Sequence, residues 1–364
     1  MSVRTIGILG GGQLGRLIAQ AARRLGFGTI SWDPTPGGPA AQVCDENIVA
    51  KFDDPAAEDR FRSVCDIVTF EWENVHADLA QRMLTQPAAS VLCIIQDRLV
   101  QRQWLAAHGF PQTRFGEAVS AADLPFGPTV VKCRKGGYDG KGQARFSSRR
   151  EAQGAAIFNV PCVWEKFVEF EREISVILAR GQDGQIAVFP IAENVHRNGI
   201  LFKTRAITLL QDIGQDVGAK AVMLATRIAK ALKYVGVLAV EMFLLPDGEL
   251  LVNEIAPRVH NSGHYTLGGC ITSQFEQHVR AVAGLPLGPT SLVGPSTMVN
   301  LLGDLWEHGE PDWRLIDQIP GLTRYLYGKA EARPGRKMGH YVVVGEKAPI
   351  EWFRANERLA LLRR

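Results

Sequence analysis

The chain has 364 residues, of which 46% are hydrophobic and 22% are charged, and its formal net charge at pH 7 is +3. This composition excludes a disordered chain, a collagen, a coiled coil and a small disulfide scaffold, and the length suggests two or three domains of roughly 150 residues each. The small net charge gives no reason to expect a nucleic-acid partner, and no apolar run approaches the roughly 20 residues that a membrane helix needs.

The N-terminus and the cysteines both favour a cytoplasmic protein. The chain starts a strand at once, without the basic and apolar regions of a signal peptide. Its six cysteines, at positions 44, 65, 93, 133, 162 and 270, lack the close spacing of zinc ligands. We therefore expect free thiols in a reducing compartment.

The first part of the chain alternates between strand and helix patterns. A strand over 4–9 precedes a glycine turn, a helix over 16–25 and further strands over 29–32 and 66–70, and a helix is expected over 74–84. Such alternation is typical of a parallel sheet with helices on its faces. We assign residues 1–98 to an N-terminal Rossmann-like domain.

The glycine turn, Gly10 to Gly15, matches the pattern G-x-G-x-x-G between a strand and a helix. Backbone amides at a helix N-terminus bind anions, and Asp33 ends the next strand, where an acidic residue would hold a nicotinamide ribose. A dehydrogenase, another phosphate-bearing ligand and a turn required only for packing all remain open from this segment alone.

The middle region, 99–170, is expected to form a small α+β domain. A helix over 97–108 is followed by a strand near 125–132, a glycine-rich basic loop over 134–143 and a strand over 160–168. Backbone amides in such a loop can cover phosphates while lysines neutralise charge, and Lys132 could reach the same phosphates. The loop is not a Walker A motif, and an exposed mobile loop is the alternative interpretation.

Longer alternating strands follow from residue 171 to 364, with helices over 219–232 and 273–283 and a strand-rich tail. The turn residues Pro246, Asp247 and Gly248 indicate a β-hairpin. Its pairing is expected to place Leu245 opposite Leu250, Phe243 opposite Val252, and Glu241 opposite Glu254.

The facing glutamates of this hairpin, Glu241 and Glu254, predict a metal site. Two carboxylates side by side within apolar strands repel each other, and a divalent cation between them relieves that repulsion. Mg²⁺ typically takes one or two carboxylates together with phosphate oxygens and water. The alternatives are a register shifted by one residue or side chains that both reach solvent.

A polar segment, 253–264, follows the second hairpin strand. Arg258 and His260 can donate hydrogen bonds to an anion, and Asn261 can donate or accept. The spacing of His260 and His264 raises the question of zinc, but Pro257 and Gly263 disfavour the continuous helix that a zinc site there would need. By itself, the basic pair before the strand at 339–344 is typical of a solvated turn.

Seven motifs occur in order along the chain: GGGQLGR (10–16), TFEWENV (69–75), QDR (96–98), GGYDGKGQ (136–143), NEIAPRVHNSGH (253–264), TSQFEQH (272–278) and RKMGH (336–340). With them the chain resembles, from end to end, the N5-carboxyaminoimidazole ribonucleotide synthetase family of the ATP-grasp superfamily. The resemblance implies an ATP-grasp fold: an N-terminal Rossmann-like domain similar to that of biotin carboxylase, a small lid domain and a C-terminal domain. It also implies an enzyme of purine biosynthesis that uses ATP and Mg²⁺.

In that family, ATP phosphorylates bicarbonate to carboxyphosphate, which then carboxylates the amine of 5-aminoimidazole ribonucleotide and leaves ADP and phosphate. The resemblance implies a nucleotide site made of Arg98, Lys132, Gly137, Tyr138, Asp139, Gly140, Lys141, Gly142, Gln143, Glu165, Lys166, Phe167, Val168, Glu173, His196, Asn253 and Glu254. It implies Mg²⁺ ligands at Glu241 and Glu254, with one or two ions.

The remaining roles concern the other substrates. The resemblance implies that bicarbonate and carboxyphosphate are surrounded by Arg258, His260, Asn261 and Lys337. It places Tyr138, Asp139 and Lys141 against the ribonucleotide, and Gly12, Gln13 and Leu14 near its phosphate, with Glu73 nearby. It also implies a homodimer.

One position departs from the wider ATP-grasp pattern. Many of those enzymes place an asparagine two residues after the second metal glutamate, where this chain has Ala256, and here Asn253 precedes Glu254. The third protein ligand of a second ion therefore stays open. Three alternatives stay open: a formate-using ATP-grasp transformylase, a nonenzymatic nucleotide-binding module and a dehydrogenase. The dehydrogenase would need a nicotinamide pocket, and the chain offers no second part of one.

Overall fold

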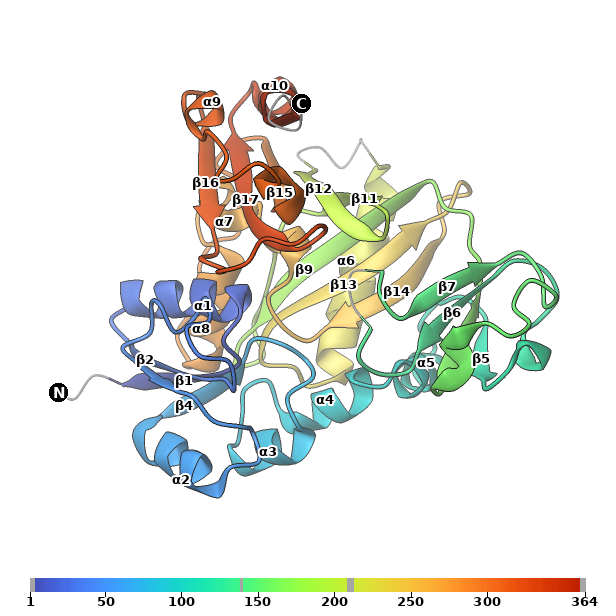
Figure 1. Cartoon of the computed structure of the whole chain (residues 1–364), viewed down its shortest axis with the longest axis horizontal. Coiled ribbons are helices and arrows are strands. Elements are labelled where there is room, and N and C mark those ends of the chain that lie inside the picture. The colour runs from blue at the N-terminus through green and yellow to red at the C-terminus, as the bar shows by residue number, and fades with distance from the viewer. Residues whose placement is uncertain (1–3, 138–139, 208–212, 361–364) are drawn as a thin grey trace.

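The computed structural model describes residues 4–137, 140–207 and 213–360, and Tyr138 and Asp139 of the predicted site lie outside them. The chain forms three parts that are distinct in the ribbon view (Figure 1). An N-terminal part, a small sheet and a large antiparallel sheet follow one another along the sequence.

The N-terminal part contains the predicted parallel sheet, which has four strands in the order β3-β2-β1-β4. Helix α1 buries one stripe of apolar residues, including Leu14, Leu17 and Ile18, because these recur at helical spacing. The predicted helix over 74–84 is shorter in the structure, and a further helix follows Pro87. The elements are β1 (Thr5–Leu9), α1 (Gln13–Arg24), β2 (Gly28–Trp32), β3 (Glu46–Ile48), α2 (Pro55–Val64), β4 (Ile67–Phe70), α3 (Ala77–Arg82) and α4 (Ala89–Ile95).

Helix α5 (Arg98–Ala107) leads into the small sheet. Its N-terminus is capped by Asp97, whose carboxylate accepts hydrogen bonds from the backbone of Leu99 and Val100. Four antiparallel strands in the order β5-β8-β6-β7 then enclose a small core of their own. They are β5 (Phe115–Ala118), β6 (Thr129–Cys133), β7 (Gln143–Phe146) and β8 (Cys162–Lys166), with short helical turns η1 (Ala121–Asp123) and η2 (Ala156–Asn159).

The large sheet has nine strands, eight of them in the order β14-β13-β9-β11-β12-β15-β17-β16, and β10 pairs with β9. Helices α6 (Gln215–Ala231) and α8 (Gln274–Val282) pack against it. The buried face of α6 consists of small and aliphatic residues, whereas that of α8 also contains polar side chains, including Gln274 and Gln277. Its first strands are β9 (Arg172–Arg180), β10 (Ile186–Val188), β11 (Ala192–Arg197), β12 (Ile200–Ala206), β13 (Gly236–Leu244) and β14 (Leu250–Ala256), followed by η4 (Asn261–Gly263) and α7 (Thr266–Gly269).

The C-terminal tail continues this sheet, because β15 pairs with β12. The tail is strand-rich as predicted, but it also contains a 13-residue helix, α10, that the sequence patterns did not indicate. Its elements are β15 (Ser296–Leu302), η5 (Gly303–Trp306), α9 (Arg314–Asp317), β16 (Leu322–Leu326), β17 (Lys337–Val344) and α10 (Ala348–Ala360).

Two further observations concern the described residues as a whole. All six cysteines are free thiols. Within residues 4–137, 140–207 and 213–360, no helix is both long and apolar enough to cross a membrane.

Candidate active site

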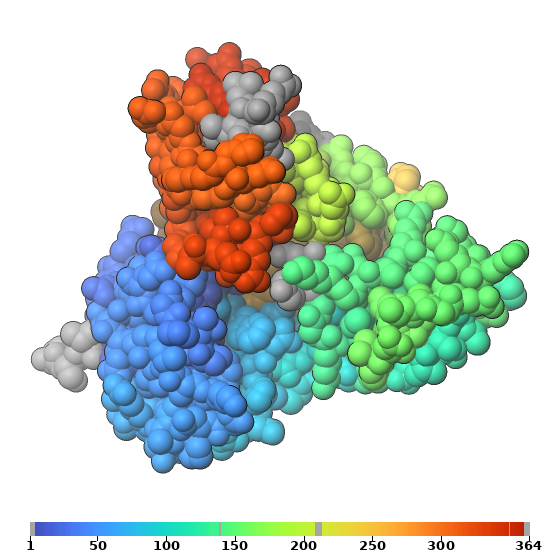
Figure 2. All heavy atoms as spheres, in the orientation of Figure 1, coloured from blue at the N-terminus to red at the C-terminus, as the bar shows by residue number. Residues whose placement is uncertain are grey.

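A cavity of 870 Å³ lies where the three parts of the chain meet, and the space-filling view shows a recess between them (Figure 2). Every predicted site residue that the structure describes lines this cavity. They are Gly12, Gln13, Leu14, Glu73, Arg98, Lys132, Gly137, Gly140, Lys141, Gly142, Gln143, Glu165, Lys166, Phe167, Val168, Glu173, His196, Glu241, Asn253, Glu254, Arg258, His260, Asn261 and Lys337. Residues spread over most of the sequence are therefore brought to one place.

The predicted carboxylate pair is present, because Glu241 of β13 and Glu254 of β14 are directly paired across the hairpin. The expected pairs nearer the turn were wrong: Leu244, and not Leu245, faces Leu250, and Val252 faces Met242. A β-bulge between the two sets of pairs inserts one extra residue in β14 and restores the expected register at the glutamates.

The electrostatics of the pair suit a cation. Burial raises the pKa of Glu241 to about 7; the charge of Glu254 also raises it, and His196 opposes the rise. Within the described ranges, no group of three His, Cys, Asp or Glu side chains could hold a metal ion. An ion bound by these two carboxylates would need further oxygens from phosphate or water, which is the coordination that Mg²⁺ prefers.

A buried polar chain supports Glu241 from behind. Ser175 donates to the Glu241 carboxylate over 3.4 Å, Asn194 donates to the Ser175 hydroxyl over 2.6 Å, and Thr204 donates to Asn194 over 2.9 Å. Beside it, His196 Nδ1 lies 2.5 Å from a Glu173 oxygen. Burial lowers the pKa of His196, but the hydrogen bond to Glu173 and the charges of Glu173 and Glu241 together raise it overall.

Glu165 connects the small sheet to helix α5 and to β14. Its two oxygens accept from Arg102 over 2.9 Å and from Lys132 over 2.8 Å, and Arg102 also donates to the backbone carbonyl of Asn253 over 2.8 Å. Burial alone would raise the pKa of Glu165, but the two cations lower it to about 2. Lys132 is thus held at the cavity by a carboxylate, and Arg102 is a supporting residue that the sequence patterns missed.

The anion-binding candidates are also held by partners. Arg258 forms an ion pair with Glu73, with one bond of 3.1 Å, although the two residues are 185 positions apart. Burial opposes the charge of Arg258, but Glu73 raises its pKa overall. The side-chain amide of Asn261 is paired in both directions with that of Asn300, over 3.1 and 2.7 Å, so Asn300 is a second residue that the patterns missed.

The first glycine turn is occupied by acidic side chains of its own chain. The backbone N–H groups of Gly12 and Gly15 donate to the two oxygens of Glu71 over 2.6 and 2.8 Å. Gly11 N–H donates to Asp33 over 2.8 Å. The aspartate that could have held a nicotinamide ribose is therefore bound to the turn itself. Gln13 and Leu14, the first two residues of α1, line the cavity next to this turn.

The second glycine loop is held by a cation instead. Arg98 donates to the backbone carbonyls of Cys133 and Gly137 over 3.0 and 2.7 Å. Gly140 and Gly142 have φ values of +76° and +69°, which side chains with a Cβ rarely adopt. Arg98 thus binds the loop in this structure, and it lines the cavity beside Lys132.

Comparison with known proteins decides the family. Residues 3–96 match the ribonucleotide synthetase preATP-grasp domain, residues 103–275 the ATP-grasp domain, and residues 296–350 the phosphoribosylaminoimidazole carboxylase C-terminal domain. N5-carboxyaminoimidazole ribonucleotide synthase of Brucella melitensis is 45% identical over 356 residues, which are 92% of this chain and 95% of the relative. The chain belongs to the N5-carboxyaminoimidazole ribonucleotide synthase family.

Solved structures of this family have the same fold. A crystal structure of N5-carboxyaminoimidazole ribonucleotide synthetase with ADP has a TM-score of 0.90 and 38% identity, covering 98% of this chain and 97% of that chain. The synthase from Aspergillus clavatus, in complex with ADP and 5-aminoimidazole ribonucleotide, has a TM-score of 0.87 and 29% identity over 99% of both chains. The family and the ATP-grasp fold predicted from the seven motifs are confirmed.

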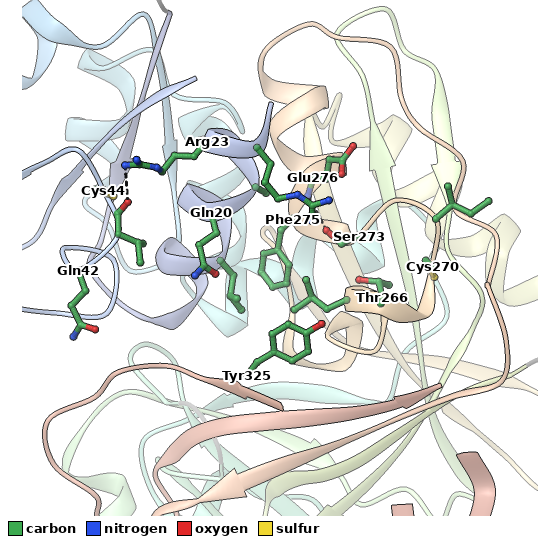
Figure 3. Close-up of a pocket in the computed structure, with 17 residues that line it drawn as sticks. Gln20, Arg23, Gln42, Cys44, Thr266, Cys270, Ser273, Phe275, Glu276 and Tyr325 are labelled. Atoms are coloured by element: carbon green, nitrogen blue, oxygen red, sulfur yellow. Dashed lines mark hydrogen bonds between the residues drawn. The ribbon is translucent and has the colours of Figure 1, made fainter. Parts of the chain in front are cut away.

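A second cavity, of 880 Å³, lies between α1 and α8, with Tyr325 of β16 in its lining (Figure 3). Arg23 of α1 and Ser273, Phe275 and Glu276 around the start of α8 also line it. No residue predicted for the synthase site lines this cavity, as far as the described residues go, so the candidate active site is the cavity between the three parts.

Proposed function

We propose that this chain is an ATP-dependent carboxylase that converts 5-aminoimidazole ribonucleotide, bicarbonate and ATP to N5-carboxyaminoimidazole ribonucleotide, ADP and phosphate in purine biosynthesis. The observation that carries the proposal is the facing pair Glu241 and Glu254 in one cavity with Arg258 and Lys337. A carboxylate pair can bind the cation that accompanies a nucleotide, and the basic residues can neutralise the charge of an anionic intermediate. Membership of the synthase family supports the same reaction.

The nucleotide would bind between the small sheet and the large one. Glu165, Lys166, Phe167 and Val168 would line the adenine pocket, Glu173 would take the ribose, and Lys132 and the second glycine loop would cover the phosphates. When bound at Glu241 and Glu254, Mg²⁺ would neutralise charge on the phosphate oxygens. Placing the phosphates and neutralising their charge is most of what phosphoryl transfer requires.

The chemistry divides into two steps. A bicarbonate oxygen takes the γ-phosphoryl group and ADP leaves; the amine of the ribonucleotide then attacks the carbonyl carbon of carboxyphosphate and phosphate leaves. Arg258, His260, Asn261 and Lys337 would surround the bicarbonate and the intermediate. Because carboxyphosphate reacts readily with water, the second glycine loop, with Tyr138, Asp139 and Lys141, would close over the ribonucleotide and exclude solvent.

The phosphate of the ribonucleotide would lie at the first turn of α1, near Gln13 and Leu14. Lys329 and Arg336 line the same cavity from the C-terminal tail. Arg336 belongs to the RKMGH motif, although no role was predicted for it, and Lys329 was not singled out from the sequence. Basic side chains opposite a helix N-terminus are a suitable environment for a phosphate group. The amides of Gly12 and Gly15 would not contact it, because Glu71 occupies them.

The carboxylate pair is tested by Glu241→Gln and Glu254→Gln, with Glu249→Gln as the matched control at an exposed position of the same hairpin. We expect both site variants to lose ATP-dependent product formation by about a thousandfold or more while they stay folded, because several kcal/mol of transition-state stabilisation is removed. ADP release should be measured at saturating Mg²⁺, with and without bicarbonate and ribonucleotide. Near wild-type rates in both site variants would contradict the metal role, and ADP release that needs formate in place of bicarbonate would contradict the carboxylase.

Two further proposals concern the whole protein. We propose a cytoplasmic homodimer of about 80 kDa, twice the 39.9 kDa of one chain. The proposal rests on the resemblance to the synthase family. A mass of about 40 kDa by light scattering at micromolar concentration would contradict the dimer.

A further inference from the structure

The motif at 272–278 contains a glutamine that holds the main chain of His260. Gln274, the first residue of α8, is fully buried, and its side-chain amide forms hydrogen bonds with other residues of the chain. Its Oε1 accepts from the backbone N–H of His260 over 2.9 Å, and its Nε2 donates to the backbone carbonyl of His260 over 2.7 Å. The same Nε2 lies 3.0 Å from His264 Nδ1. One side-chain amide therefore holds both ends of the segment 260–264.

The orientation of this amide follows from its partners. A backbone N–H can only donate and a backbone carbonyl can only accept, so the oxygen of Gln274 must face the first and its nitrogen the second. The fit also depends on Gly263, since a Cβ at that position would lie 2.4 Å from Gln274 Oε1. Both the donor and the acceptor of the amide, and the glycine beside it, are matched to one arrangement of the segment.

We propose that Gln274 is a positioning residue for carboxylation, which acts by holding His260 at the cavity wall. This inference rests on the proposed function, in which His260 and Arg258 surround carboxyphosphate. His260 lines the cavity, and its ring is fixed from the other side by Ser262, whose hydroxyl lies 2.8 Å from Nδ1. Because β14 ends at Ala256, the segment that follows has no strand pairing of its own to hold it, and Gln274 supplies the equivalent bonds.

Displacement of His260 has a specific chemical consequence. If the intermediate is not held against the amine, water attacks carboxyphosphate in its place, which regenerates bicarbonate and releases phosphate. The net reaction is then hydrolysis of ATP to ADP and phosphate without a new carbon–nitrogen bond. Loss of positioning should therefore appear as ADP release that exceeds carboxylated product, and a merely structural loss of stability would not produce that excess.

The chain contains a matched control one turn further along the same helix. Gln277 is also fully buried, and its amide also holds one residue through both main-chain groups: Nε2 donates to the carbonyl of Gly288 over 2.6 Å, and Gly288 N–H donates to Oε1 over 2.9 Å. Gly288 belongs to the connection between α8 and β15, away from the residues of the candidate site. Gln274 and Gln277 thus share residue type, helix, burial and bonding, and differ in the segment that they hold.

The test compares Gln274→Met with Gln277→Met, in which the side chain keeps a similar volume and loses its hydrogen bonds. We expect both variants to melt at similarly reduced temperatures. Gln274→Met should form carboxylated product about tenfold to a hundredfold more slowly than wild type, with KM for ATP within about twofold, because small misplacements of reacting groups cost about this much. Its ratio of ADP to product should rise well above one, while Gln277→Met should keep a ratio near one.

Gly263→Ala provides a second variant in case Gln274→Met fails to fold, and its new Cβ should displace the amide and raise the same ratio. A ratio near one in Gln274→Met and in Gly263→Ala would overturn the positioning role, as would an equal rise in Gln277→Met. Absence of ribonucleotide carboxylation in the wild-type protein would instead contradict the proposed function, so the two failures are distinguishable.

Discussion

The two glycine-rich loops of the chain have similar sequences and opposite chemical surroundings. The first, at 10–15, donates its N–H groups to the carboxylates of Glu71 and Asp33. In the second, at 136–142, the carbonyl oxygen of Gly137 accepts a hydrogen bond from the guanidinium of Arg98, which also donates to the carbonyl of Cys133 at the end of β6. A glycine motif thus shows where a backbone can approach a ligand, but the side chains that reach the loop from elsewhere decide which of its groups remain for that ligand.

The carboxylates near the two loops also differ in charge balance. Glu71 is buried, and although it accepts two backbone hydrogen bonds, burial raises its pKa. Glu165, beside the strand that leads into the second loop, is buried against Arg102 and Lys132, and its pKa falls to about 2. The carboxylate of Glu71 at the first loop is therefore stabilised by hydrogen bonds from the backbone. The carboxylate of Glu165 near the second loop is stabilised by ion pairs with two cations.

Lowering the pH should reveal the difference between Glu165 and Glu71 most strongly, through the free energy of unfolding. The folded pKa of Glu165 lies below its ordinary value of 4.5, so its ion pairs stabilise the fold fully above about pH 4.5 and lose that effect as the pH falls toward 2. A shift of this size corresponds to roughly 3 kcal/mol. In urea unfolding at a series of pH values, wild type should lose about this much more stability across the window than Glu165→Gln. Glu71→Gln serves as the comparison and should not flatten the acid limb, because the pKa of Glu71 is shifted upward.

Removal of Arg98 should release the second loop and spare the first. In Arg98→Ala, one charge-assisted bond to the loop carbonyl of Gly137 and one to the carbonyl of Cys133 at the end of β6 are lost. We expect kcat/KM for ATP to fall about a hundredfold, which corresponds to about 2.7 kcal/mol. Arg98→Lys should be intermediate, because an ammonium is a single point of charge and does not reproduce the forked guanidinium. Steady-state kinetics over a range of ATP concentrations would measure this, and an unchanged value in the alanine variant would contradict the role of Arg98.

In the first loop, a side chain larger than glycine should be destabilising because there is no room for it. Gly12 has a φ of −81°, which any residue can adopt, but a Cβ there would lie 2.5 Å from a Glu71 oxygen. We expect Gly12→Ala to lower the free energy of unfolding by about 2 kcal/mol through overpacking. Because the same Glu71 contact is at stake, Gly12→Ala combined with Glu71→Ala should cost less than the sum of the single changes. Strict additivity in chemical denaturation would argue that the glycine is required for another reason.

In the second loop, substitutions of glycine should act through the backbone conformation, and we expect their effect on stability to be the smallest of those considered. At Gly142 the φ of +69° disfavours side chains, so Gly142→Ala should cost about 1 kcal/mol of stability, while Gly142→Asn should cost less because asparagine tolerates this region. Thermal unfolding of the two variants would rank them. Equal losses would indicate that contacts around Gly142, and not its φ, decide the residue.

Local patterns in the sequence were sufficient for the elements and for the key pair of the site. The glycine turn between a strand and a helix, the hairpin turn at 246–248 and the alternation of β13 and β14 each lie within a short stretch of chain. The pairing of Glu241 with Glu254 was predicted, although the bulge that makes it compatible with the turn was not. The seven motifs then indicated the family, because their order and spacing are a property of the sequence itself.

Only the tertiary structure decided which groups hold these residues in place. Glu71 reaches Gly12 and Gly15 across 59 and 56 positions, Arg102 reaches Glu165 across 63, and Arg258 reaches Glu73 across 185. Gln274 was quoted within a motif, yet nothing in its neighbours indicates that it bonds to the main chain of His260. No short-range pattern in the sequence, such as a hydrophobic period or a turn residue, predicts these contacts, because they depend on how the strands of three sheets are arranged in space.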